Sequence, residues 1–251
     1  MECSLDSQYA QEYYSQEREH WWYVVREKLL VQALRARLGP GARLKVLNVG
    51  AATGRSSEAL GAFGEVTSVE YDPVLCEFLQ SRLQIPAIQA SVTELPFDDE
   101  SFDLVCAFDV IEHVEDDGLA AAELARVCRQ GGTVAISVPA FQSLWSQHDE
   151  INHHFRRYLS PQVGLLFAGK LRLEYATYFN SLLFVPIWIY RMLSRWLPKP
   201  PGSGSDFQAV NPKSLVNRLF YALFSLELLC LRFWRFPVGV SLLHLYSKAA
   251  V

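Results

Sequence analysis

The sequence lacks the cysteine pairs and other signatures that several large protein classes require. Its five cysteines, an odd number, are dispersed and never form C-x-x-C, which argues against a disulfide framework or a zinc site and favours a reducing compartment. The polar, acidic N-terminus does not resemble a signal peptide. Neither G-K-[ST] nor a complete G-x-G-x-x-G occurs, which argues against a P-loop. A cytoplasmic protein is expected.

Long uncharged apolar runs are also missing, although charge is distributed unevenly. Residues 1–180 carry 15 Lys and Arg against 25 Asp and Glu, whereas residues 181–251 carry 8 against 2. The apolar segments 182–197 and 212–234 are interrupted by charge, which argues against membrane spans. Basic and aromatic residues are interleaved in the tail, which predicts a cap over an apolar ligand site or a peripheral contact with an anionic membrane. No nucleic-acid motif appears, so nucleic acid is not an expected partner.

Strand-like and helix-like segments alternate along the first 180 residues. A near-continuous apolar run at 102–108 is typical of a central parallel strand that is covered on both faces. This alternation predicts an α/β fold with a doubly wound parallel sheet, whose ligands sit at the carboxyl ends of the strands. The expected strands are 44–49, 66–70, 85–90, 102–108, 133–138, 171–179 and 238–246. The expected helices are 8–38, 55–63, 72–83, 116–129, 161–169, 182–197 and 212–234, with a linker at 198–205.

The segment 46–54 runs an apolar strand into a loop of small residues that opens a helix. Small side chains let the backbone turn tightly and approach a ligand closely. About twenty residues later a second strand ends at Glu70, whose carboxylate can accept both hydroxyls of a ribose. Together the two features predict half of a nucleoside-binding βαβ unit.

Several motifs in order resemble those of the class I S-adenosylmethionine-dependent methyltransferases. The 46–54 loop is similar to their V-L-D-x-G-x-G-x-G, 90–103 to their G-D-A-x-x-L-P-F-x-D-x-S-F-D, and 108–114 to the S-x-x-L-E-H-V that follows strand 4. The opening Glu19–Tyr23 with Arg26 resembles the H-W-W-F…R start of a bacterial small-molecule subgroup. The resemblance implies a Rossmann-like, mostly parallel, seven-stranded sheet. It also implies an N-terminal helical lid (1–42), a cofactor-binding core (43–180) and a basic, apolar helical cap with a closing strand (181–251).

The resemblance implies S-adenosylmethionine as the cofactor. It places Gly50, Ala51 and Gly54 beneath the methionine and ribose, Glu70 on the ribose hydroxyls and Tyr71 beside adenine. Four positions depart from the family pattern: Asn48 replaces the motif aspartate, Ala51 and Ala52 occupy the glycine loop, and Ser91 replaces an adenine-binding aspartate. The cofactor-binding residues expected on this basis are Trp22, Arg26, Asn48, Gly50, Ala51, Gly54, Glu70, Tyr71, Ser91, Val92, Phe108 and Asp109.

Histidines gather in the polar segment 140–160, which should overhang the transferred methyl group. A hydroxyl or carbon-acid acceptor needs a base, and histidine is the commonest one. The candidate catalytic residues are His113, His148, His154 and Tyr158. No metal site is predicted, because no independent ligand cluster supports one built from His148, Asp149, His153 and His154.

The expected function is methyl transfer to a small, hydrophobic or amphipathic acceptor, a secondary metabolite or lipid-like molecule, by a monomer or homodimer. One alternative is a non-catalytic cofactor- or partner-binding module on the same fold, which the changes at Asn48 and Ser91 encourage. The other is a nicotinamide-dependent oxidoreductase, which Ala51 and Ala52 disfavour.

Overall fold

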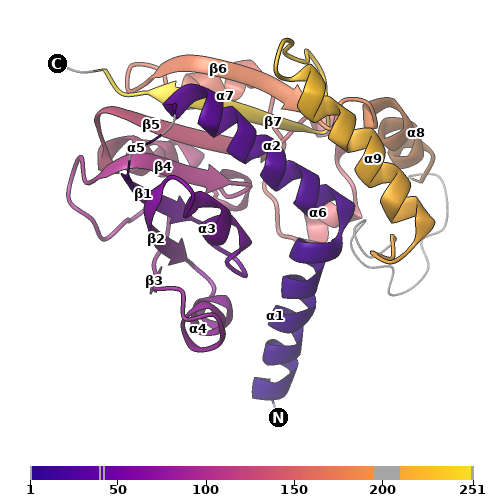
Figure 1. Cartoon of the computed structure of the whole chain (residues 1–251), viewed down its shortest axis with the longest axis horizontal. Helices are drawn as coiled ribbons and strands as arrows, with labels where there is room; N and C mark the ends of the chain where they lie inside the picture. The colour runs from indigo at the N-terminus through magenta and orange to yellow at the C-terminus, as the bar shows by residue number, and fades with distance from the viewer. Residues whose placement is uncertain (1, 40, 42, 195–209, 250–251) are drawn as a thin grey trace.

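The computed structural model describes residues 2–39, 41, 43–194 and 210–249, with residues 2–7 and 194 described by their backbone alone. The described residues form one seven-stranded sheet with the order β3-β2-β1-β4-β5-β7-β6 (Figure 1). Strands β1 to β5 are parallel, and β7 runs antiparallel between β5 and β6. The strands are β1 (Leu44–Val49), β2 (Gly64–Glu70), β3 (Ala87–Gln89), β4 (Phe102–Phe108), β5 (Cys128–Pro139), β6 (Arg172–Phe179) and β7 (Ser241–Ser247).

Side chains alternate between two cores along the central strand. Leu104 and Cys106 of β4 join the core beneath α2 and α9, while Val105 and Ala107 join the opposite core beneath α5 and α7. All four are fully buried, so this strand is covered on both faces as its apolar run predicts. The helices are α1 (Glu2–Glu19), α2 (Trp21–Leu38), α3 (Arg55–Leu60), α4 (Pro73–Arg82), α5 (Asp117–Val127), α6 (Gln147–Ile151), α7 (Ser160–Leu166), α8 (Phe184–Ser194) and α9 (Leu215–Cys230).

The predicted helix at 8–38 is two helices, and that prediction was wrong in this respect. His20 separates them with an extended backbone (φ −79°, ψ 131°), and its Nδ1 accepts a hydrogen bond from the Trp22 N–H at 3.3 Å. This side-chain cap satisfies one of the donors that begin α2. Because the chain bends here, α2 lies across the sheet while α1 extends beyond its edge towards α4 (Figure 1).

The C-terminal region packs against the N-terminal one. Helices α2 and α9 lie side by side on one face of the sheet (Figure 1). The amide oxygen of Asn217 in α9 accepts the Trp21 N–H at 2.9 Å, and Lys28 donates to the Tyr221 hydroxyl at 2.6 Å. Strand β7 lies between β5 and β6, so this region completes the sheet as well as covering it. The predicted linker at 198–205 lies outside the described residues.

The polar segment 140–160 holds short helices that the sequence analysis did not predict. They are the 3-10 turn η2 (Gln142–Leu144) and the short α-helix α6. A second 3-10 turn, η1 (Ile111–His113), lies outside this segment and follows β4. Ser146 caps α6, and its own N–H donates to the Asp149 carboxylate at 2.8 Å. Ser-x-x-Asp is a reciprocal cap, and this spacing was the sequence signal for α6.

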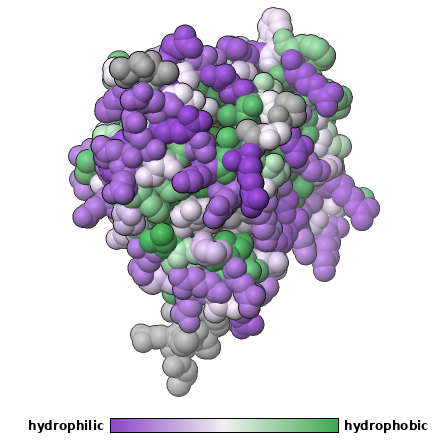
Figure 2. Space-filling model, turned by 60° about the vertical axis from the view of Figure 1, so that its left-hand side comes forward, coloured by the Kyte–Doolittle hydropathy of each residue, from purple (hydrophilic) through white to green (hydrophobic). Residues whose placement is uncertain are grey.

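One face of the molecule is largely hydrophilic, with hydrophobic side chains in small groups (Figure 2). Elsewhere, α8, α9 and the turn after α9 expose large apolar side chains, among them Tyr190, Leu215, Phe233 and Trp234, which are 61%, 79%, 91% and 67% exposed. Among the described residues, every helix is too short or too polar to cross a membrane.

Candidate active site

The loop after β1 turns at Gly50 in a way that only glycine tolerates well. Its φ is +73°, and a Cβ built there would lie 2.5 Å from Cγ2 of Val110. The N–H groups of Gly50 and Ala51 both donate to the Val69 carbonyl, at 2.8 and 3.0 Å. The loop is thereby tied to the end of β2 and placed at the carboxyl edge of the sheet, where ligands of such folds bind.

Glu70, at the end of β2, connects two loops on this edge. One carboxylate oxygen accepts the Ala52 N–H at 2.7 Å, and the other accepts the Asp72 N–H at 2.9 Å. The side chain is only 7% exposed; burial raises its pKa, and the backbone donors oppose that shift. Each carboxylate oxygen has a second acceptor site, so both can still receive a hydroxyl.

Asn48 lies beneath the loop rather than in it. It is buried, and its amide nitrogen donates to the hydroxyls of Ser56 and Ser57 at 2.8 and 2.9 Å. Helix α3 is thereby fixed to the end of β1. The amide therefore shapes the loop from below.

The residues predicted to contact adenine lie on an open edge. Tyr71 is 74% exposed, and the Ser91 hydroxyl is hydrogen-bonded to the Thr93 hydroxyl at 2.7 Å. Val92 is buried next to them. An exposed aromatic ring beside Glu70 is compatible with stacking on a planar base.

Helix α1 covers the glycine loop. The Thr53 hydroxyl donates to the buried carboxylate of Glu17, and Arg18 forms an ion pair with Glu58 of α3 at 2.7 Å. Burial raises the pKa of Glu17, and its hydrogen bond with Thr53 and neighbouring arginines oppose that shift. The N-terminal helix therefore forms part of the site wall.

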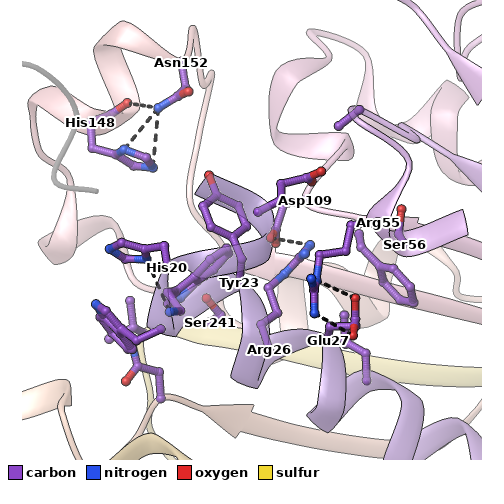
Figure 3. Close-up of a pocket in the computed structure, with 18 of the residues that line it drawn as sticks. His20, Tyr23, Arg26, Glu27, Arg55, Ser56, Asp109, His148, Asn152 and Ser241 are labelled. Carbon is purple, nitrogen blue, oxygen red and sulfur yellow. Dashed lines mark hydrogen bonds and ion pairs between the residues drawn. The ribbon is translucent and has the colours of Figure 1, made fainter. Parts of the chain in front are cut away.

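Arg26 of α2 reaches the carboxyl end of β4. Its guanidinium lies 2.6 Å from the Asp109 carboxylate, which also accepts the Ser137 hydroxyl at 3.1 Å (Figure 3). The Trp22 ring lies 5.0 Å from the guanidinium carbon. Asp109 has φ +56°, an uncommon conformation for a non-glycine residue that often marks functional sites. In the structure Arg26 is paired with Asp109, whereas the sequence analysis expected Arg26 to bind the cofactor.

These elements enclose a cavity of about 780 Å³. Its polar end is lined by the glycine loop, α2 and the carboxyl end of β4, and its apolar end by α8 and α9. Figure 3 shows Arg26 and Asp109 facing each other in this cavity, with Glu27 and Arg55 paired beside them. The predicted site residues that line the cavity are Trp22, Arg26, Gly50, Phe108, Asp109, His113, His148 and His154. Those that do not are Asn48, Ala51, Gly54, Glu70, Tyr71, Ser91, Val92 and Tyr158.

Three of the predicted histidines come together on one wall. The ring centroid of His154 lies 4.5 Å from that of His113 and 5.9 Å from that of His148. His148 contacts the Asn152 amide at 3.1 Å (Figure 3). Although His113 is partly open to the cavity, burial and the neighbouring His154 ring lower its pKa to about 4. His153 is exposed and does not line the cavity.

Tyr158 does not face this cavity. Its buried hydroxyl donates to the Asp117 carboxylate at 2.9 Å, and burial with that carboxylate raises its pKa. A phenol held in this way anchors the segment after α6 to the start of α5. The placement does not support the predicted catalytic role.

Two buried polar residues in the cavity wall were missed by the sequence analysis. Glu112 is fully buried, and its carboxylate has no hydrogen-bond partner among the described residues. Asn180, which follows β6, is also buried, and its side-chain amide has no hydrogen-bond partner among the described residues. Glu112 could have been found as the acidic residue of the 108–114 motif, whereas no local signal marks Asn180.

Comparison with known proteins finds similarity in the central part of the chain. Residues 47–136 match a family model described as a methyltransferase domain. A Mycobacterium tuberculosis protein named as a probable S-adenosylmethionine-dependent methyltransferase is 32% identical over 124 residues, which are 48% of this chain and 43% of that protein. A demethylmenaquinone methyltransferase of Clavibacter sepedonicus is 34% identical over 104 residues, 39% of this chain and 42% of that protein. The chain thus matches less than half of each of these curated relatives.

Solved structures show the same fold at low identity. A Haemonchus contortus phosphoethanolamine N-methyltransferase in complex with S-adenosyl-L-methionine aligns with a TM-score of 0.56 at 14% identity, over 88% of this chain and 52% of that one. A [4+2]-cyclase aligns with the same TM-score and identity, over 88% and 80%. Fold likeness alone therefore does not fix the reaction. The family match, the motif order and the sheet topology together show that residues 47–136 are similar to a methyltransferase domain and that the sheet has the fold of class I S-adenosylmethionine-dependent methyltransferases.

Proposed function

We propose that this protein transfers a methyl group from S-adenosylmethionine to a small hydrophobic or amphipathic acceptor and releases S-adenosylhomocysteine. The observation that carries the proposal is the single cavity that joins the glycine loop to the apolar side chains of α8 and α9. Residues 43–180 would hold the cofactor, with residues 1–42 as its lid and 181–251 as the acceptor cap.

The residues at the polar end of the cavity and on the sheet edge beside it fit this cofactor. The Gly50 turn leaves backbone open to a ligand, and both oxygens of Glu70 retain acceptor sites for ribose hydroxyls. Tyr71 would stack on the base, and the Phe108 carbonyl would accept a hydrogen bond from the α-amino group. When bound, the cofactor supplies a methyl group on a cationic sulfur. The Trp22 ring, which lines this end, would offer an aromatic face to that cation.

The apolar end fits an acceptor with a substantial hydrocarbon or aromatic part. Leu183, Ile187, Phe220 and Leu223 line it, and Asn180 adds a polar group without a partner among the described residues. The chain's contribution to catalysis would be to align the acceptor atom with the methyl group and to exclude water, which are the main demands of an in-line displacement.

An acceptor panel tests this proposal. We expect turnover, followed as S-adenosylhomocysteine release, with phenols or long-chain amphiphiles and none with small polar acceptors. Glu70→Ala should weaken S-adenosylhomocysteine binding by about 1–3 kcal/mol, because it removes charged hydrogen bonds to the ribose. Cofactor binding without turnover of any acceptor would favour the non-catalytic module, and turnover of polar acceptors alone would contradict the acceptor class.

The exposed side chains of the α9 end favour delivery of the acceptor from a membrane surface. Phe233 and Trp234 are largely exposed, and Arg232 and Arg235 beside them are also exposed. Aromatic side chains flanked by arginines are suited to the interface of an anionic bilayer. We infer that this turn, residues 231–236, contacts the membrane peripherally.

Vesicle co-sedimentation tests the contact. Binding to phosphatidylglycerol-containing vesicles should exceed binding to phosphatidylcholine alone and should fall at least tenfold in the Phe233→Ser, Trp234→Ser double variant. Leu165→Ser, on the exposed side of α7, is the matched control and should leave binding unchanged. Equal binding of all three proteins would contradict the inference.

A further inference from the structure

Glu112, His113 and His154 converge on the wall of the cavity. One potential ligand atom from each lies within 4.8 Å of the others. Glu112 and His113 come from the turn η1 that follows β4, and His154 comes from the segment after α6. The Phe155 N–H donates to the Glu112 carbonyl at 2.8 Å, which fixes that segment against the turn. The three side chains are therefore brought together by the fold rather than by neighbouring sequence alone.

The buried Glu112 carboxylate lacks a hydrogen-bond donor or cation among the described residues. The side chain is fully buried, and neither carboxylate oxygen has a hydrogen-bond partner among the described residues. Asp109 adds negative charge nearby, while Arg26 is bound to Asp109 and Arg157 to Asp149. A buried carboxylate without a partner is costly, and a bound cation would remove that cost.

A second layer of contacts orients His154. Its Nδ1 lies 2.9 Å from the Asp149 carboxylate, which is itself fully buried and held by Arg157 at 2.7 Å and by the Ser146 N–H at 2.8 Å. Because Nδ1 is occupied, Nε2 is the atom available to a ligand. A histidine that binds a metal through one nitrogen and a carboxylate through the other is the usual arrangement in metal sites.

We propose that Glu112, His113 and His154 form a binding site for one divalent transition-metal ion such as Zn²⁺. Two imidazoles and one carboxylate suit Zn²⁺, Co²⁺, Mn²⁺ or Fe²⁺, whereas Ca²⁺ and Mg²⁺ prefer oxygen ligands throughout. Tetrahedral ligands with bonds of about 2.1 Å lie about 3.4 Å apart, so small side-chain rotations would close the site. The sequence analysis expected no metal; of the four residues it weighed, only His154 is a ligand here and Asp149 supports it.

Three protein ligands leave at least one position open towards the cavity. This part of the inference rests on the proposed function: an acceptor hydroxyl would occupy the open position and lose its proton to water. The oxygen would then use its electron pair to form the bond to the methyl carbon as the carbon–sulfur bond breaks towards sulfur. The acceptor class favoured by the site is therefore an alcohol, phenol or other oxygen nucleophile.

Metal titration of the full chain tests the site. The chelator-treated protein is titrated with Zn²⁺ by calorimetry and with Co²⁺ by visible absorption. We expect a stoichiometry of one, with at least tenfold weaker binding in Glu112→Gln and His154→Asn, and 10–100-fold weaker binding in Asp149→Asn through loss of the supporting contact. His153→Asn is the matched control, because this exposed neighbour is outside the cluster, and it should bind as the unaltered protein does.

Two results would overturn the metal site. One is the absence of a stoichiometric site in the unaltered protein, and the other is equal binding in the Glu112 and His154 variants and in the control. Should a variant fail to fold, the Co²⁺ spectrum of the unaltered protein decides, since imidazole and carboxylate ligands give no thiolate charge-transfer band. Titration of the same sample with S-adenosylhomocysteine reports separately on the proposed function.

Discussion

The two ends of the cavity are built in different ways. At the polar end charged side chains are held in specific pairs: Arg26 with Asp109, and Arg55 with Glu27. At the apolar end Ile187 and Phe220 contribute shape and hydrocarbon surface, and no described hydrogen bond directs them towards a ligand. Under the proposed function, the polar end would select the cofactor through placed charges, whereas the apolar end would select only a class of acceptor through its shape.

The largest effect is expected where a specific contact of the polar end is removed. Arg26→Met leaves the Asp109 carboxylate without its closest partner in a largely buried position, and should lower the free energy of unfolding by about 3 kcal/mol. Urea denaturation measures this change. Arg18→Met removes a partner of the half-exposed Glu58 and should cost less than about 1 kcal/mol. Equal losses in the two variants would remove the distinction drawn for Arg26.

A pH-dependent effect is expected beside the apolar end, at Glu227 of α9. Its buried carboxylate accepts the Leu182 N–H at 2.8 Å, and burial raises its pKa to about 7. The folded protein therefore binds more protons at Glu227 than the unfolded chain between about pH 4.5 and 7. The contribution of this residue to stability falls as pH rises through that window, and the loss persists unchanged at higher pH.

Glu227→Gln should remove that dependence while keeping the hydrogen bond. The difference in unfolding free energy between variant and unaltered protein should shift by about 3 kcal/mol in favour of the variant between pH 4.5 and pH 8. Urea denaturation at the two pH values measures it. A difference that does not change with pH would show that folding does not raise the pKa of Glu227.

The smallest effect is expected from truncating the apolar end. Phe220→Ala should raise KM for an apolar acceptor about tenfold, about 1.4 kcal/mol, because contact area is lost, and should leave S-adenosylhomocysteine affinity unchanged. Steady-state kinetics and calorimetry measure the two quantities. Leu165→Ala, exposed on α7, is the control. A parallel loss of cofactor affinity would show that the two ends of the cavity are not separate.

The sequence predicted the parts of the fold that depend on local pattern. The runs at 44–49 and 102–108 correspond to β1 and β4 in the structure, because apolar strands bounded by turns carry their own signal. The break at His20 was missed, because the helical periodicity continues across it and only the cap interrupts the backbone. The short helix α6 was missed because its signal is a single Ser-x-x-Asp spacing in a polar segment.

The site could be predicted only where strand order brings residues together. Glu70 ends β2 and Asp109 follows β4, two parallel strands on either side of β1, so their shared edge follows from topology. The partner of Arg26, by contrast, depends on how α2 crosses the sheet. Asn180 enters the cavity from β6, far away in sequence, and the convergence of His154 on Glu112 depends on how the segment after α6 folds back, which no spacing reveals.

The measurement that tests the central claim most directly is calorimetric titration of the full chain with S-adenosylhomocysteine and with NAD in parallel. The glycine loop and Glu70 predict binding of S-adenosylhomocysteine at one site and no detectable binding of NAD. Binding of NAD without binding of S-adenosylhomocysteine would contradict the assignment of this cavity to the methyl donor.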